Sequence, residues 1–241
     1  MNRLLGAACV FPPALAFAAA FALSTPLPAQ VSEGEPAPAP PVATPGQPDP
    51  SLVSGGHYIA DPHHTLVEWS VDHLGFSPYF GLFGDITGTL DVDPSRPEQA
   101  RVAMTIPVAQ VTVASPGLKE HLLKPPATEG GKPDFFGPSP KDAHFVSTMV
   151  RTTGDGRAEM AGNLTLNGVT RPVTLQVRFH GAGTMPQAMG GGELVGFEAT
   201  GTLKRSDFGL DFSIPLVSDA VDLKIAAAFV KDAGGNASGG N

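Results

Sequence analysis

Residues 160–179 read MAGNLTLNGVTRPVTLQVRF, and this stretch decides the fold. Apolar and polar side chains alternate on both sides of the Asn167-Gly168 pair. A period of two is typical of a strand with one buried face. Asn-Gly favours a tight hairpin turn, because both residues tolerate a positive φ. The stretch therefore predicts a β-hairpin with one apolar face.

The same alternation recurs from His57 to Asp232 and predicts about eight strands. The other runs lie at residues 65–72, 85–92, 102–108, 145–151, 195–203 and 221–229. Strands with one apolar face are typical of antiparallel sheets. Eight of them form either a two-sheet sandwich or a closed barrel, and the pattern alone leaves both open. One short helix is expected, at residues 116–123, inside a long segment from Thr112 to Asp142.

The composition excludes several classes of protein. The chain has 241 residues, of which 29 are Gly and 25 are Pro, and this share disfavours a helical bundle. The net charge of −8 disfavours nucleic-acid binding, which needs clustered Lys and Arg. A single Cys excludes an internal disulfide framework and a Cys-rich zinc module.

The two ends of the chain differ in composition from its centre. Residues 1–29 have one basic residue, an apolar run and a small residue at a cleavage point, which predicts a signal peptide and a periplasmic or secreted protein. An uncleaved anchor is the alternative, although Pro12-Pro13 would interrupt its helix. Residues 30–56 are expected to form a Pro/Ala-rich disordered linker, residues 57–232 the folded domain, and residues 233–241 a flexible tail.

No catalytic motif emerges, and neither a catalytic residue nor a metal site is expected. His57, His63 and His64 cluster near the first strand, but no second group at ligand spacing completes a metal site. The long segment carries Lys119, His121, Lys124 and Lys132. It is interpreted either as a lid whose basic groups meet a ligand head or as a solvated crossover.

Several short motifs occur in order along almost the whole folded part: Tyr58 to Thr65 with Trp69 and His73, Gly81 to Gly84, His121-Leu122, Asp134 to Phe136, Gly162 to Thr170, Arg205 to Gly209 and Val217 to Val221. Together they resemble the YceI family of secreted lipid-binding barrels. Thr65 stands where the family usually has Ser. The insertion from Pro125 to Lys132 is longer than is typical, which affects the expected barrel mouth.

The resemblance implies an eight-stranded, antiparallel, lipocalin-like β-barrel with a short helix in a long loop. It also implies a long apolar cavity that holds a polyisoprenoid or similar lipid, in a periplasmic or secreted protein. Some relatives are associated with membrane-bound b-type cytochromes, so an electron-transfer partner is a further hypothesis. No cofactor other than a bound lipid is expected.

The candidate ligand-binding residues divide into a lining and a head-group site. The lining candidates are Trp69, Val71, Ile86, Leu90, Met104, Ile106, Phe145, Met149, Phe197 and Leu203. Each of them is also consistent with ordinary core packing. The head-group candidates are Arg205, His121 and Lys124, with pairing of Arg205 to Asp207 or another carboxylate as the alternative.

Three functions are consistent with these observations. The first is a lipid carrier or sequestering protein that performs no chemistry. The second is an enzyme acting on a lipid through residues such as His64 or His73, and the third is a partner-binding accessory module. The sequence does not choose among quinone, polyprenyl phosphate and fatty ligands, nor between a monomer and a homodimer.

Overall fold

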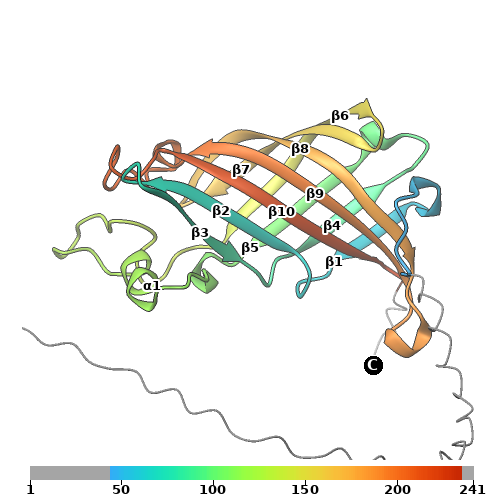
Figure 1. Ribbon diagram of the computed structural model, residues 1–241, viewed down its shortest axis with the longest axis horizontal. Coiled ribbons are helices and arrows are strands. Elements are labelled where there is room, and N and C mark those ends of the chain that lie inside the picture. Colours follow the sequence, from blue (N-terminus) through green and yellow to red (C-terminus); the bar gives the residue numbers. More distant parts are fainter. Residues whose placement is uncertain (1–43, 235–241) are drawn as a thin grey trace, which may run out of the picture. The chain divides into compact units, whose positions relative to one another are not determined.

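The computed structural model describes residues 44–234, which form a closed antiparallel β-barrel (Figure 1). The eight barrel strands follow the order β1-β4-β5-β6-β7-β8-β9-β10, and β10 pairs back with β1. They are β1 (Gly56–Ala60), β4 (Thr87–Val92), β5 (Arg101–Ile106), β6 (Ala143–Gly154), β7 (Arg157–Leu166), β8 (Val169–Thr184), β9 (Glu193–Lys204) and β10 (Ala220–Lys231). The barrel is therefore confirmed over the sandwich.

The two further strands of the described region, β2 (Leu66–His73) and β3 (Ser77–Phe83), form a hairpin attached to the barrel. β10 pairs with β1 near its C-terminal end and with β2 over its first half. Thr65 lies at the break between β1 and β2 and is 1% exposed. Its hydroxyl donates to the carbonyl of Ala228 (3.1 Å) and accepts from the Ala228 N–H (3.2 Å). Thr65 thereby satisfies the β10 backbone where the strand pairing is interrupted.

The expected hairpin joins β7 to β8. Leu166 pairs with Val169, and the turn residues Asn167 and Gly168 have φ values of 53° and 76°. Positive φ at both central positions matches the right-handed twist of the strands. The Asn167 side-chain amide also donates to the carbonyl of Phe208 at 3.0 Å. The local sequence signal and the tertiary contact thus favour the same turn.

The long segment between β5 and β6 lies at one end of the barrel (Figure 1). It contains η3 (Val108–Gln110) and the expected helix, α1 (Pro116–Leu122). Ser115 caps α1, because its hydroxyl accepts from the Leu118 N–H at 3.4 Å. Thr112 and Leu82 exchange two backbone hydrogen bonds of 2.8 Å, which attach the segment to β3.

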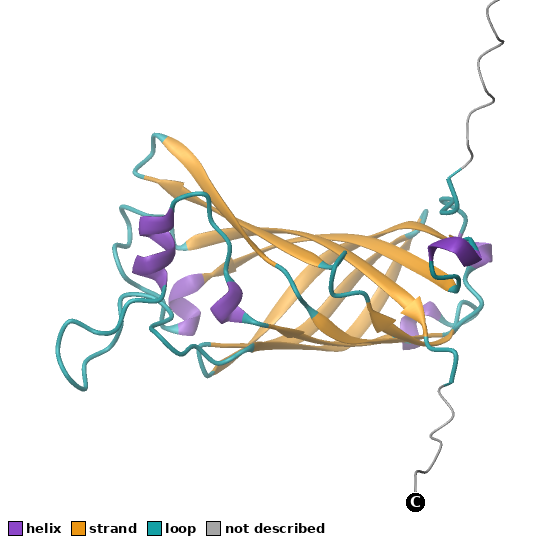
Figure 2. Ribbon diagram, turned by 90° about the horizontal axis from the view of Figure 1, so that it is seen from below, coloured by secondary structure: helices purple, strands orange, loops and turns teal. Residues whose placement is uncertain are grey.

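The barrel has two distinct ends (Figures 1 and 2). The α1 end carries α1, the tip of the β2–β3 hairpin and residues 205–218, which begin with η5 (Arg205–Phe208). The η1 end carries η1 (Pro50–Leu52), η2 (Pro97–Gln99), η4 (Gln187–Met189) and the β6–β7 turn. No helix within residues 44–234 is long and apolar enough to cross a membrane.

Residues just before the barrel are ordered against it, so the part of the expected linker from Gln47 onward differs from a disordered spacer. Gln47 exchanges two backbone hydrogen bonds of 2.9 Å with Ala182 of β8. Ser54 donates through its N–H (2.9 Å) and its hydroxyl (2.5 Å) to Glu193 of β9. The expected signal peptide, the first part of the linker and most of the expected tail lie outside the described residues.

A cluster of buried core residues lies among β1, β4, β8, β9 and β10. Its buried members are Tyr58, Ala60, Leu90, Ala182, Val195 and Phe229. The Tyr58 hydroxyl donates to Glu193 at 2.5 Å, and burial together with this carboxylate raises the pKa of Tyr58 to about 12. Burial opposes ionisation of Glu193, but hydrogen bonds from Ser54 and Tyr58 outweigh it and lower the pKa of this carboxyl.

Candidate functional site

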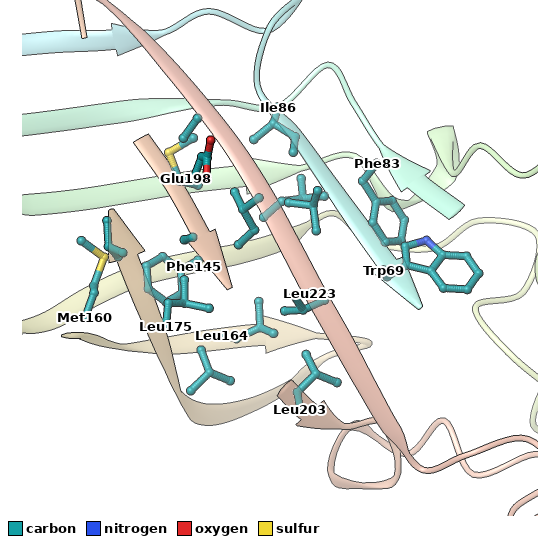
Figure 3. Close-up of a pocket in the computed structure, with 18 of the residues that line it drawn as sticks. Trp69, Phe83, Ile86, Phe145, Met160, Leu164, Leu175, Glu198, Leu203 and Leu223 are labelled. Carbon is teal, nitrogen blue, oxygen red and sulfur yellow. The ribbon is translucent and has the colours of Figure 1, made fainter. Parts of the chain in front are cut away.

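A cavity of about 1080 Å³ runs along the inside of the barrel (Figure 3). Its lining includes Pro50 and Val53 at the η1 end and Leu118, His121 and Phe135 at the α1 end. Typical small-molecule sites measure roughly 300–1,000 Å³. The cavity is slightly larger than that range, and its lining residues extend from one end of the barrel to the other.

The alternating sequence makes this interior apolar, and the residue burial shows that it is hollow. Inward-facing residues such as Val102, Met104, Val177 and Ile225 line the cavity and are only half-buried. In a close-packed core such side chains would be fully enclosed by neighbours. Figure 3 shows Leu164, Phe145, Leu175, Leu203 and Leu223 around the same space. The barrel thus offers an apolar chamber rather than a filled core.

Eleven of the thirteen candidate residues line this cavity. They are Trp69, Val71, Ile86, Leu90, Met104, Ile106, Phe145, Phe197, Leu203, His121 and Arg205. The inward direction of the apolar members follows from the period of two along each strand. Whether these side chains contact a ligand stays a prediction.

Met149 does not line the cavity, and a β-bulge explains the difference. β6 pairs Ser147 with Gly162 but Met149 with Ala161, so one extra residue is inserted in β6. Such an insertion reverses which positions face inward. Met149 is 51% exposed on the outer face, and Val150 lines the cavity instead.

The position of Arg205 differs from the head-group and carboxylate-pair interpretations. The residue is 5% exposed, and its guanidinium donates four hydrogen bonds of 2.7–2.8 Å to backbone carbonyls. The acceptors are Leu210, Phe212, Val217 and Ser218. Burial lowers the pKa of Arg205, against the opposing charges of Asp219 and Asp211. Arg205 therefore holds the 205–218 segment in place at the α1 end.

Two of the basic residues of the long segment pair with carboxylates. His121 lies 2.9 Å from Asp134 through Nε2, and Lys132 pairs with Asp211 at 2.7 Å. His121 also packs edge-on against Phe135, with ring centroids 5.2 Å apart. Lys124 is exposed and does not line the cavity. The segment thus presents mainly aromatic and apolar groups to the interior.

The sequence analysis missed the residues contributed by β3. Tyr79 and Phe83 line the cavity, but the run from Ser77 to Phe83 contains Pro78 and shows little alternation. Proline is confined to edge strands, and β3 is an edge strand that pairs with β2. The ring of Trp69 and the aromatic residues of β3 therefore come together only through the hairpin.

The histidines near the first strand lie in separate places. His57 pairs with Asp91 at 2.7 Å and His64 with Asp61 at 2.6 Å, and neither lines the cavity. His73 lies at the end of β2 and does line it. Across residues 44–234, no three His, Cys, Asp or Glu side chains are grouped so that they could hold a metal ion.

The fold and the cavity define a small closed antiparallel barrel that encloses one elongated apolar chamber, an architecture shared with lipocalins. The family model described as the YceI-like domain matches residues 58–229, and the chain belongs to this family.

Relatives and solved structures agree with this assignment. A UPF0312 protein of Pseudomonas putida (strain F1) is 34% identical over 189 residues, covering 75% of this chain and 92% of its own. The YceI protein of Campylobacter jejuni is 27% identical with a TM-score of 0.54, over 67% of this chain and 90% of that one. BcnA of Burkholderia cenocepacia has the same fold, with 22% identity and a TM-score of 0.57 over 70% and 98% of the two chains.

Proposed function

We propose that the protein binds a long apolar lipid of the isoprenoid class inside its barrel and carries or sequesters it without chemical change. The observation that carries this proposal is the cavity of about 1080 Å³, whose wall is formed mainly by Val, Leu, Ile, Phe and Met. A branched hydrocarbon tail matches such a wall in both shape and polarity. The elongated form of the chamber favours a chain over a compact ligand.

Burial of the apolar tail is sufficient to account for binding of the lipid. Each buried CH₂ contributes about 0.8 kcal/mol, so a tail of about twenty carbons gains on the order of 16 kcal/mol. Association costs about 4–15 kcal/mol in lost freedom and ordering. Burial of the tail therefore outweighs the cost without any covalent or metal-mediated step.

The proposed compartment is the periplasm or the outside of the cell. The support is the leader at residues 1–29, with its single basic residue, apolar run and small residue before a polar stretch. The mass of the mature chain purified from its host tests this point. A mass that includes the leader would contradict cleavage.

Native mass spectrometry of the protein purified from its own host tests the lipid proposal. We expect a bound mass that matches an isoprenoid and that is lost after extraction with detergent. The extracted protein should then take up an added C20 isoprenoid with one-to-one stoichiometry. A chain that carries no lipid when isolated, and that binds none after extraction, would refute the proposal.

A further inference from the structure

Trp69 and Tyr79 lie on the same face of the β2–β3 hairpin and both line the cavity. In the register of the hairpin, Trp69 is opposite Gly81 and Tyr79 is opposite Val71. The two aromatic residues are therefore diagonal neighbours, a spacing across which large side chains reach one another. They form one aromatic patch on the wall of the cavity.

The polar atoms of this patch, Trp69 Nε1 and Tyr79 Oη, are buried and have no hydrogen-bond partner among the described residues. A buried donor without a partner is costly, and native proteins seldom keep one without a reason. Phenylalanine would fill either position without this cost. Two such atoms on one cavity wall indicate a ligand that supplies the missing partner.

The position of the indole ring is fixed by its surroundings. A Cβ atom added at Gly81 would lie 2.5 Å from Trp69 Cζ2 and 2.8 Å from the carbonyl oxygen of Thr112. The ring therefore packs directly over the Gly81 backbone. Indole Nε1 is only a donor, whereas a phenol both donates and accepts. The ligand atom that meets Trp69 must consequently be a hydrogen-bond acceptor.

The charges on the lining distinguish between neutral and anionic acceptors. Arg205 already donates to four carbonyls, and His121 faces Asp134. Arg157 lies in the β6–β7 turn at the η1 end. His73, at the exposed tip of β2, is a poor substitute for the Arg or Lys with which proteins usually hold phosphate. The wall near Trp69 therefore favours an uncharged oxygen.

We propose that Trp69 and Tyr79 form a head-group subsite for an uncharged oxygen acceptor, such as a quinone carbonyl or a phenol oxygen, at the end of an isoprenoid tail. This inference rests on the proposed lipid-binding function and adds the head-group class to it. Trp69 Nε1 donates to the ligand oxygen, and the Tyr79 hydroxyl donates to the same head. A polyprenyl phosphate is disfavoured, because its charge would be buried without a cation.

The chain provides its own reporter for this subsite. Trp69 is the single Trp, and Tyr79 is one of two Tyr. The probes are menaquinone-4 and geranylgeranyl phosphate, which carry the same C20 tail, added to the delipidated full chain. We expect menaquinone-4 to quench the fluorescence of Trp69 and to bind at least tenfold more tightly than geranylgeranyl phosphate.

Substitution of the two tyrosines separates binding from folding. Tyr79→Phe should lower the affinity for menaquinone-4 about three- to tenfold, the value of one lost hydrogen bond, and leave the ligand-free Tm unchanged or raised. Tyr58→Phe is the matched control, because the Tyr58 hydroxyl is bonded to Glu193 and the residue does not line the cavity. It should lower the Tm and leave the affinity unchanged.

Trp69→Phe, measured by calorimetry because the reporter is lost, should lower the affinity for menaquinone-4 by a similar factor. The inference is overturned if both Trp69→Phe and Tyr79→Phe bind menaquinone-4 as tightly as the original chain. It is also overturned if geranylgeranyl phosphate is the tighter ligand. A saturated C20 hydrocarbon without a head distinguishes the two levels: if neither it nor menaquinone-4 binds, the proposed lipid function fails together with the subsite.

Discussion

Substitution of Val177 by Phe tests directly whether the barrel is hollow. Val177 lies on β8, lines the cavity and is half-buried. Its cross-strand neighbours are the small residues Ala158 of β7 and Ala199 of β9, which also line the cavity. A larger side chain at this position therefore has space on both sides and projects into the middle of the chamber.

The expected effects on folding and on binding have opposite signs. Phe adds about four carbons, each contributing about 0.8 kcal/mol when buried, or about 3 kcal/mol in total. Partial burial of the new ring should raise the free energy of unfolding of the ligand-free chain by about 1–2 kcal/mol, which corresponds to roughly 2–8 °C in Tm. The same ring displaces about four carbons of a bound tail, so the affinity for a C20 isoprenoid should fall about 100-fold.

Urea denaturation and calorimetric titration of the delipidated chain measure the two quantities. Val146→Phe is the matched control, because Val146 is 52% exposed on the outside of β6. That variant should change neither the free energy of unfolding by more than about 0.5 kcal/mol nor the affinity. If Val177→Phe instead destabilises the chain by about 1–3 kcal/mol, the interior is a close-packed core. If Val177→Phe binds the C20 isoprenoid as tightly as the original chain, the bound tail does not run past Val177.

Three further predictions concern stability. Arg205→Met should lower the free energy of unfolding in urea by at least about 3 kcal/mol, the value of two charge-assisted hydrogen bonds; unchanged stability with lost binding would restore Arg205 as a head-group residue. Hydrogen bonds lower the pKa of Glu193, so its ionised carboxylate stabilises the folded chain. This contribution to the free energy of unfolding is complete above the usual pKa of Glu and is lost as the pH falls through the lowered pKa of Glu193. The free energy of unfolding of Glu193→Gln, measured at a series of pH values, should therefore fall less steeply than that of the original chain between about pH 5 and pH 3; parallel curves would contradict this account. Gly81→Ala should lower the Tm and shift the fluorescence of Trp69, because the new Cβ would meet both the indole ring and the carbonyl of Thr112; an unchanged spectrum would show that the ring is not fixed there.

Much of the fold can be predicted from local patterns in the amino-acid sequence. The alternation in residues 160–179 predicts two strands and their inner faces, because neighbouring side chains of a strand point to opposite sides. The Asn167-Gly168 turn and the Ser115 cap of α1 are also local, since each satisfies its own backbone geometry. These features require no knowledge of what packs against them.

The candidate site could be predicted only where the alternation is uninterrupted. The inward positions of Met104, Phe145 and Leu203 follow from it. Met149 does not, because a bulge in β6 arises from pairing with β7 and reverses the inward face. Tyr79 was missed because β3 becomes a strand only through its hydrogen bonds to β2.

The sequence alone determined a series of antiparallel strands, each with one apolar face. The two-residue period of the apolar side chains and the chemistry of the turns both depend on residues that are close in the chain. Closure of the barrel was decided by pairing of β1 with β10, between residues such as Tyr58 and Lys231 that no local pattern relates. The hollow interior and the four carbonyls around Arg205 likewise depend on the distance between opposite walls and loops. Whether an inward side chain meets another side chain or an open cavity is a property of that distance, and only the tertiary structure sets it.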